Sequence, residues 1–265
     1  MRGQKMMDTD DAQVGRILSR REVLALLGGS GAALIAAACA PGGQSAASPT
    51  ASAPSSTAAA ATSTAAATAA ATALPSCIVR PALTEGPYFV DEKLDRSDIR
   101  SDPATGVVRP GAVLTLNFLV SRVTGSVCTA LSGAVVDVWH CDALGVYSDV
   151  DGARGQKFLR GYQTTDASGT AKFTTVYPGR YQGRAVHIHF KIRPTASSEF
   201  TSQLFFDDAL STQVFAQAPY SQKGTQGITR NAQDGIFQQS GGKLTLNVTK
   251  SGDAYAATFD IGLAS

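Results

Sequence analysis

Short runs of alternating apolar and polar residues follow one another through the last two thirds of this 265-residue chain. Side chains on a strand point alternately to opposite faces, so each run predicts a strand with one buried face. Turn signals rich in glycine separate the runs, and no long segment has the period of an amphipathic helix. Strands are expected at 112–120, 134–139, 158–164, 171–176, 186–192, 201–206, 243–249 and 254–261. The pattern predicts an all-β fold, in the form of a β-sandwich.

The folded domain is expected to begin near Cys77, because the tract before it cannot build a core. Residues 40–76 are almost entirely Ala, Ser, Thr, Pro and Gly, with no charged or aromatic residue. Such a composition predicts a disordered linker. The domain predicted at 77–265 has roughly 190 residues, which is enough for one sizeable core.

Residues 1–39 have the features of an export signal. Two arginines at 20–21 directly precede an apolar run at 23–38, which is shorter than the about 20 residues that span a bilayer. Paired arginines in this position resemble the twin-arginine signal with which bacteria export folded proteins. The Ala-Ala-Ala-Cys sequence that ends at Cys39 resembles a lipoprotein cleavage box, and ordinary cleavage without lipidation is the alternative. The domain is therefore expected outside the cytoplasm, either anchored to a membrane through Cys39 or secreted.

Three cysteines would remain after export, at positions 77, 128 and 141. An oxidising compartment favours one disulfide and leaves one thiol, and the sequence does not choose among the three pairings. The spacing includes no Cys-x-x-Cys, so neither a zinc site nor a redox motif is indicated. A net charge of +2 provides no basic field that would attract nucleic acid.

Two of the three histidines in the chain fall in one triplet, His187-Ile188-His189. On the strand expected at 186–192 the two imidazoles point to the same face. Neutral imidazole is a ligand for iron, zinc or copper, so the triplet predicts half of a metal site. Tyr181 lies six residues before His187, with Arg184 between them. The alternative is a pair of half-exposed histidines on a polar strand face.

The remaining metal ligands are not the usual carboxylates. None stands near the histidine triplet, and Asp207 and Asp208 are distant in sequence. Tyrosinate is the better candidate, from Tyr181 and from Tyr147, which follows the strand expected at 134–139. Taken alone, Tyr147 could equally be an aromatic residue at the edge of a hairpin.

Five segments carry motifs that are specific in combination: 84–88 (Thr-Glu-Gly-Pro-Tyr), 136–147, 158–161 (Phe-Leu-Arg-Gly), 177–190 and 203–206 (Gln-Leu-Phe-Phe). Together they resemble the intradiol ring-cleavage dioxygenases, the non-haem iron(III) enzymes that include catechol and protocatechuate dioxygenases. The resemblance implies that a catechol and O2 are the small-molecule partners. It implies cleavage of the ring between its two hydroxyls, which gives a muconate-type diacid.

The resemblance makes four residues the ligands of a non-haem Fe(III): Tyr147, Tyr181, His187 and His189. Tyr181 takes the place of the axial ligand that the catechol displaces, and it would accept a catechol proton. Arg184 takes the place of an arginine beside the substrate, and Gln203 that of a glutamine near the oxygen side. Only two residues separate Tyr181 from Arg184, fewer than in cytosolic members, so a more open pocket is expected. His140 is expected to be structural.

Two other classes of function fit parts of the pattern. An exported β-sandwich that binds a metal or ligand without catalysis would share the fold, which by itself does not determine function. A zinc hydrolase built on the two histidines would lack a third ligand of the usual type and a nearby general base.

Overall fold

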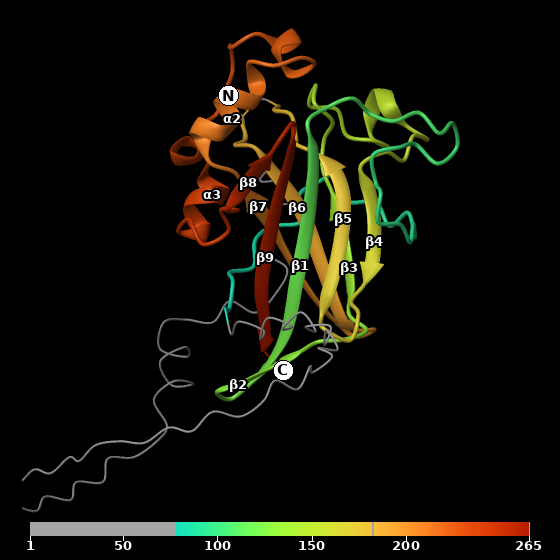
Figure 1. Ribbon diagram of the computed structural model, residues 1–265, viewed down its shortest axis with the longest axis vertical. Helices are drawn as coiled ribbons and strands as arrows, with labels where there is room; N and C mark the ends of the chain where they lie inside the picture. The colour runs from blue at the N-terminus through green and yellow to red at the C-terminus, as the bar shows by residue number, and fades with distance from the viewer. Residues whose placement is uncertain (1–77, 182, 265) are drawn as a thin grey trace, which may run out of the picture.

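The computed structural model describes residues 78–181 and 183–264, which Figure 1 draws in colour. The predicted signal at 1–39 and linker at 40–76 lie outside the described residues. The strands of the described residues form two sheets that pack face to face, which confirms the predicted β-sandwich.

The first sheet is centred on β1 (Val113–Thr124). It pairs antiparallel with β2 (Val127–Ala130) and β5 (Thr170–Val176), and parallel with β9 (Ala254–Ala264). β8 (Val248–Ser251) is added at the edge of β9. The second sheet has the order β4 (Arg160–Thr164), β3 (Val135–Trp139), β6 (His187–Thr195) and β7 (Ser198–Phe205), all antiparallel.

The core lies between the two sheets and is built from alternate residues of their strands. Leu114, Leu116 and Phe118 of β1 are fully buried. The ring centroid of Phe118 lies 5.3 Å from that of Phe190 on β6 and 5.9 Å from that of Phe259 on β9. Burial of each such side chain contributes about 1.5–3 kcal/mol, so these contacts hold the sheets together.

Strand β6 is buried on both of its faces. Ile188 and Phe190 point into the core, while His187, His189 and Lys191 alternate with them on the outer face of the second sheet. The three polar residues are also buried, at most 5% exposed. Something must therefore cover the outer face of this sheet.

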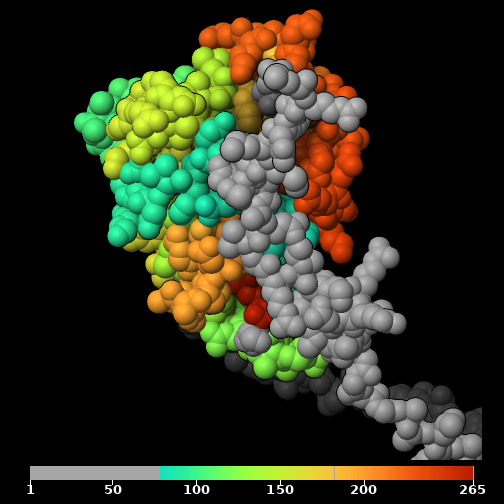
Figure 2. Space-filling model, turned by 180° about the vertical axis from the view of Figure 1, so that it is seen from behind, coloured from blue at the N-terminus to red at the C-terminus, as the bar shows by residue number. Residues whose placement is uncertain are grey.

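The cover is the segment 84–96, here called the strap, which precedes β1. Glu85 of the strap forms an ion pair with Lys191, and the ring of Phe89 lies 4.8 Å from that of Trp139 on β3. In Figure 2 this part of the chain, in teal, lies on the face of the molecule opposite to the one seen in Figure 1. The strap encloses the polar face of β6 that carries the histidines.

The predicted position of the strand at 243–249 is wrong. β8 begins at Val248, and Leu244 and Leu246 are buried without belonging to a strand. The carbonyl of Leu244 accepts from Phe205 N, and Leu246 N donates to the Phe205 carbonyl. The alternation here comes from one-sided burial against β7, which gives the same pattern as a strand.

Short helices fill the connection between β7 and β8. Within the described residues these are the α-helices α2 (Asp208–Phe215) and α3 (Gly235–Ser240), and the 3-10 turns η3 (Tyr220–Lys223) and η4 (Asn231–Gln233). A further 3-10 turn, η2 (Asp151–Ala153), lies between β3 and β4. Asp207 and Asp234 cap the two α-helices. Both helices lie at the side of the sandwich where β8 runs (Figure 1). None of the described helices is long and apolar enough to span a membrane.

The structure narrows the cysteine pairing. Cys128 is disulfide-bonded, and Cys141 is a buried free thiol. Cys77 lies outside the described residues. The expected division into one disulfide and one unpaired thiol therefore makes Cys141 the unpaired one.

Candidate functional site

Three separate segments bring the four predicted metal ligands together. His187 and His189 stand on the outer face of β6, Tyr147 lies in the loop after β3, and Tyr181 lies in the loop between β5 and β6. The two tyrosine loops cross at Gly179, whose N–H donates to the Asp142 carbonyl at 3.1 Å. A Cβ at position 179 would meet the carbonyl oxygens of both Asp142 and Ala143 at 2.4 Å. Only glycine allows the loops to approach this closely.

The donor atoms of these residues converge on one point. The Tyr181 hydroxyl lies 3.0 Å from His187 Nε2, which lies 3.1 Å from His189 Nε2. The Tyr147 ring centroid is 5.7 Å from that of Tyr181 and 6.1 Å from that of His189. The buried Tyr147 hydroxyl makes no well-formed hydrogen bond to the described residues. Two ligands about 2.1 Å from one metal and roughly at right angles are about 3 Å apart, so the spacing fits a shared ion.

A backbone carbonyl fixes the state of His187. Its Nδ1 donates to the Ala185 carbonyl at 2.6 Å, which leaves the lone pair on Nε2 facing His189. The carbonyl thus performs the orienting role that partners of metal-ligating histidines usually have. Two imidazole Nε2 atoms at 3.1 Å repel each other unless one carries a proton or a cation lies between them.

Packing holds His189 from both sides. Its ring stacks on Trp139, with centroids 5.1 Å apart and an interplanar angle of 12°. On the strap, a Cβ at Gly86 would lie 3.1 Å from His189 Cε1, and Gly86 has a φ of 74° that favours glycine. Tyr88 of the strap stacks on Tyr147 with centroids 4.4 Å apart. Tyr88 belongs to the motif at 84–88, but no role for it could be predicted from the sequence.

Burial sets the ionisation of all four candidate ligands. Desolvation lowers the pKa of His187 to about 3 and that of His189 well below its ordinary value, so both imidazoles are neutral at pH 7. Desolvation raises the pKa of Tyr181 to about 12 and that of Tyr147 well above its ordinary value. A cation bound among them would reverse this balance and favour the phenolates. The donor set therefore fits a highly charged metal ion.

Arg184 and Gln203 also lie at the site. Arg184 Nη2 donates to Gln203 Oε1 at 2.5 Å, and Gln203 Nε2 donates to the Thr84 carbonyl at 2.9 Å. Gln203 stands on β7 directly opposite His189 in the sheet register. The charge of Arg184 partly offsets the rise in pKa that burial gives the two tyrosines, and it adds to the fall in pKa that burial gives the two histidines.

Asp234 is a site neighbour that sequence reasoning missed. Its Oδ2 accepts from Arg184 Nε at 2.9 Å and from Ala185 N at 2.8 Å. Burial alone would raise the pKa of Asp234, but the charge of Arg184 and these hydrogen bonds lower it overall. An Asp-Gly-Ile-Phe sequence signals a helix cap, yet nothing in it indicates a contact with a residue 50 positions earlier.

Other candidates do not reach the site. Asp207 accepts from Leu210 N at 2.9 Å as the cap of α2, and Asp208 accepts from the backbone of Asn231. Both ring nitrogens of His140 are engaged, Nδ1 with the Cys141 carbonyl and Nε2 with Thr175 Oγ1 at 2.6 Å. Among residues 78–181 and 183–264, no group of three or more His, Cys, Asp and Glu could hold a metal ion. A metal centre on the two histidines therefore depends on the tyrosines.

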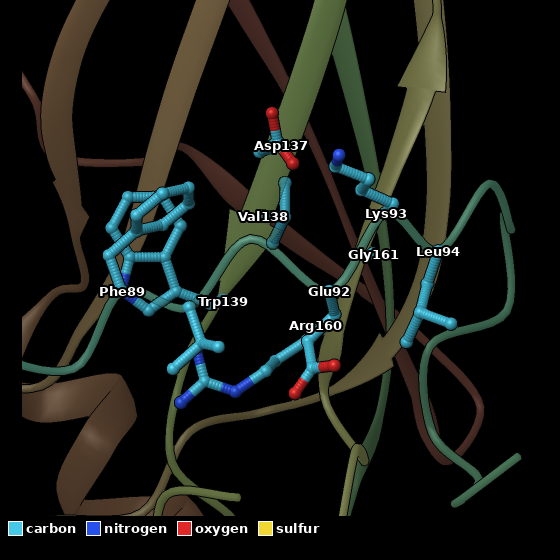
Figure 3. A pocket seen from close by; sticks show the side chains of 10 residues that line it. Phe89, Glu92, Lys93, Leu94, Asp137, Val138, Trp139, Arg160 and Gly161 are labelled. Atoms are coloured by element: carbon cyan, nitrogen blue, oxygen red, sulfur yellow. The ribbon is translucent and has the colours of Figure 1, made fainter. Parts of the chain in front are cut away.

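A small cavity lies behind Trp139 and contains none of the four candidate ligands (Figure 3). Its walls include Phe89, Glu92, Asp137, Trp139 and Arg160. Two of these residues have a buried polar atom, Trp139 Nε1 and Glu92 Oε1, without a hydrogen-bond partner among the described residues. Polar walls of this kind suit a buried water molecule and not an aromatic ring.

Comparison with known proteins places the chain in a family. A family model described as "Dioxygenase" matches residues 84–263. An intradiol ring-cleavage dioxygenase from Tetranychus urticae has 30% identity and a TM-score of 0.63, over 70% of this chain and 94% of that chain. The dioxygenase domain of a dioxygenase carbohydrate-binding protein fusion from Streptomyces sp. SirexAA-E has 29% identity and a TM-score of 0.52, over 71% of this chain and 99% of that chain.

Curated relatives agree with these structures. A chlorocatechol 1,2-dioxygenase from Pseudomonas putida is 28% identical over 145 residues, which cover 48% of this chain and 53% of that protein. The chain spans about half the length of the curated relatives it matches. The family model covers well over half of the chain, and its match contains all four converging donors together with Arg184 and Gln203. The chain belongs to the intradiol ring-cleavage dioxygenase family.

Proposed function

We propose that this protein is an intradiol dioxygenase that uses non-haem Fe(III) and O2 to cleave a catechol-type ring between its two hydroxyls. The product would be a muconate-type diacid. The observation that carries the proposal is the convergence of two phenols, one buried and one partly buried, with two neutral imidazoles beside one guanidinium. The names of curated relatives, catechol and chlorocatechol 1,2-dioxygenases, support a catechol as substrate.

The metal would be held by the hydroxyl oxygens of Tyr147 and Tyr181 and by Nε2 of His187 and His189. Two phenolates offset part of the charge of a ferric ion, which favours the oxidised state over the ferrous one. When bound, the ferric ion would draw electron density from the catechol and make its ring reactive towards O2.

The two tyrosines are held differently, and this supports different roles. Tyr147 is buried and stacked on Tyr88, whereas Tyr181 is only partly buried and lies in the loop before β6. Tyr181 is therefore the phenol that can move aside when the substrate arrives. A bound metal would favour the phenolate form of Tyr181, and on moving aside this phenolate would accept a proton from one catechol hydroxyl. The raised pKa that burial gives Tyr181 would let it keep that proton.

Arg184 and Gln203 complete the site around the ring. The guanidinium of Arg184 is positioned to stabilise the negative charge that develops on the deprotonated ring. Gln203 accepts from Arg184 and is itself held by the Thr84 carbonyl, so the strap and the arginine are linked through it. The strap and Trp139 exclude water behind His189.

We also propose that the domain is exported through a twin-arginine-type signal and then anchored through Cys39 or secreted. The arginines at 20–21 and the cleavage box before Cys39 support this. The disulfide at Cys128 supports an oxidising compartment.

Metal analysis and oxygen uptake test the proposed activity together. The purified domain should contain about one iron per chain, because one four-ligand site is proposed, and should show a visible charge-transfer band. Catechol added without oxygen should shift that band to longer wavelength. With oxygen present, O2 should be consumed one for one with catechol without added reductant, and the product should be the intradiol diacid.

Two ligand variants sharpen the test. Tyr147→Phe should change the visible band strongly, and His189→Ala should lose iron. Asp207→Asn, which alters a carboxylate away from the site, should change neither. Stoichiometric zinc without a visible band would contradict the iron site. Iron-loaded protein that responds to no catechol in a panel would favour a binding module without catalysis.

A further inference from the structure

Asp234 uses both of its carboxylate oxygens, and each does a different task. Oδ1 accepts from the backbone N–H groups of Ile236 and Phe237 and so caps α3. Oδ2 accepts from Arg184 Nε and from Ala185 N. The residue is 2% exposed, so these contacts are made away from solvent. A residue that only capped the helix would need only the two hydrogen bonds that Oδ1 accepts.

The geometry of Arg184 shows what the hydrogen bonds to Oδ2 of Asp234 achieve. A guanidinium has five N–H donors, and here Nε is bound by Asp234 while one Nη2 hydrogen is bound by Gln203. The guanidinium makes no other hydrogen bond with the residues that the structure describes. Two fixed points hold the plane of the group, and the Nη1 end remains for a ligand. With Gln203 alone, the group could rotate about that single contact.

We propose that Asp234 is a positioning residue, which fixes the guanidinium of Arg184 against Gln203 and thereby orients it for turnover. The inference rests on the proposed function, in which Arg184 lies beside the catechol. Asp234 itself touches neither substrate nor metal. An unbroken chain of contacts then runs from α3 through Asp234, Arg184 and Gln203 to the Thr84 carbonyl at the start of the strap.

Asparagine separates the two tasks of Asp234. Asn caps helices about as well as Asp, so Asp234→Asn can keep α3 capped through Oδ1. Its amide NH2 would replace Oδ2 and face the N–H donors of Arg184 and Ala185, which cannot accept from it. Asp207→Asn is the matched control, because Asp207 caps α2 through Leu210 N and its side chain makes no contact with Arg184.

The first experiment needs neither iron nor substrate. In 1H–15N spectra of the metal-free protein, the Nε–H signal of Arg184 is assigned by its loss in Arg184→Ala. A carboxylate-bound Nε–H should exchange slowly with water. Asp234→Asn should shift this signal and speed its exchange at least about tenfold, the scale expected when a charged hydrogen bond is lost. Asp207→Asn should leave it unchanged. An Arg184 signal that Asp234→Asn does not alter would overturn the proposal.

The second experiment is a double-mutant cycle on catechol turnover. Asp234→Asn should lower kcat by about tenfold or more, and should have almost no further effect in the Arg184→Ala background. Equal losses in both backgrounds would mean that Asp234 acts only through the fold. Loss of iron from Asp234→Asn would mean that it supports the histidines through Ala185, and would also overturn the proposal. Failure of the wild-type protein to turn over any catechol would refute the proposed function, while the spectra would still decide the role of Asp234.

Discussion

Gly179→Ala tests whether the crossing of the two tyrosine loops determines the geometry of the site. The φ of Gly179 is not in the left-handed region, so alanine is allowed by the backbone and the cost is steric. The added Cβ would lie 2.4 Å from the carbonyl oxygens of Asp142 and Ala143. Contacts below 3.0 Å are essentially never adopted, so the loops have to separate by about 0.6 Å or more.

That displacement is large compared with what a metal centre tolerates. Ligand distances must stay within about 0.2 Å of their ideal values, and Tyr147 and Tyr181 lie on the two loops that separate. Overpacking of a well-packed site costs about 1–3 kcal/mol. For a domain of this size, about 2–4 °C is lost per kcal/mol, so the Tm of the metal-free protein should fall by about 2–12 °C.

The assay compares three proteins by thermal unfolding without metal and by iron content after loading. Gly179→Ala should lower both the Tm and the iron content. Gly152→Ala is the control, because a Cβ at that position meets nothing within 4 Å and its φ is also outside the left-handed region. Wild-type Tm and full iron content in Gly179→Ala would refute the view that this crossing holds the ligands together. A lower Tm or iron content in the Gly152→Ala control would show that an added methyl group acts otherwise than through the contact between the two loops.

Three further outcomes are expected. Arg184→Ala should spare iron content but lower turnover by about 10²-fold, the scale of removing one electrostatic stabiliser, as steady-state oxygen uptake can measure. Burial raises the pKa of Asp137 to about 6 despite its ion pair with Arg193, so the folded state holds a proton that the unfolded state releases near pH 4. The stability that protonated Asp137 contributes is therefore present below pH 4 and is lost as the pH rises to 6. Asp137→Asn should flatten that part of the Tm-versus-pH curve. A wild-type curve and an Asp137→Asn curve of equal slope would contradict this. Replacing both arginines at 20–21 by lysine should retain the precursor in the cytoplasm, and Cys39→Ala should release the domain from the membrane fraction; cell fractionation measures both.

The strands could be predicted from alternation wherever a ladder and one-sided burial coincide. This holds for β1, where Leu114, Leu116 and Phe118 are buried in turn. It fails after Gly242, because Leu244 and Leu246 are buried in the same alternating way without a strand partner beyond Thr245. Alternation reports which side chains are buried, and it does not report which backbone groups are paired.

The histidine pair could be placed on one face of one strand for the same reason, since the period of a strand fixes the direction of successive side chains. The tyrosines, Arg184 and Gln203 came from the combined motif, because no local rule relates Tyr147 to a strand 40 residues later. Neither the strand period nor the combined motif could predict the role of Asp234. Its contact with Arg184 depends on how the chain between β7 and β8 folds back, and a cap sequence carries no information about that path.

The burial of β6 on both faces explains why the strap belongs to the site. A strand whose outer face carries His187, His189 and Lys191 would normally leave that face in water, where the imidazoles would be protonated near pH 6 and would compete with a metal. Burial keeps both imidazoles neutral, and the strap contributes to it by packing against His189. Burial of Lys191 would be costly alone, and Glu85 of the strap supplies the opposite charge. The ion pair that holds the strap in place therefore also helps keep His189, a proposed metal ligand, in its neutral form.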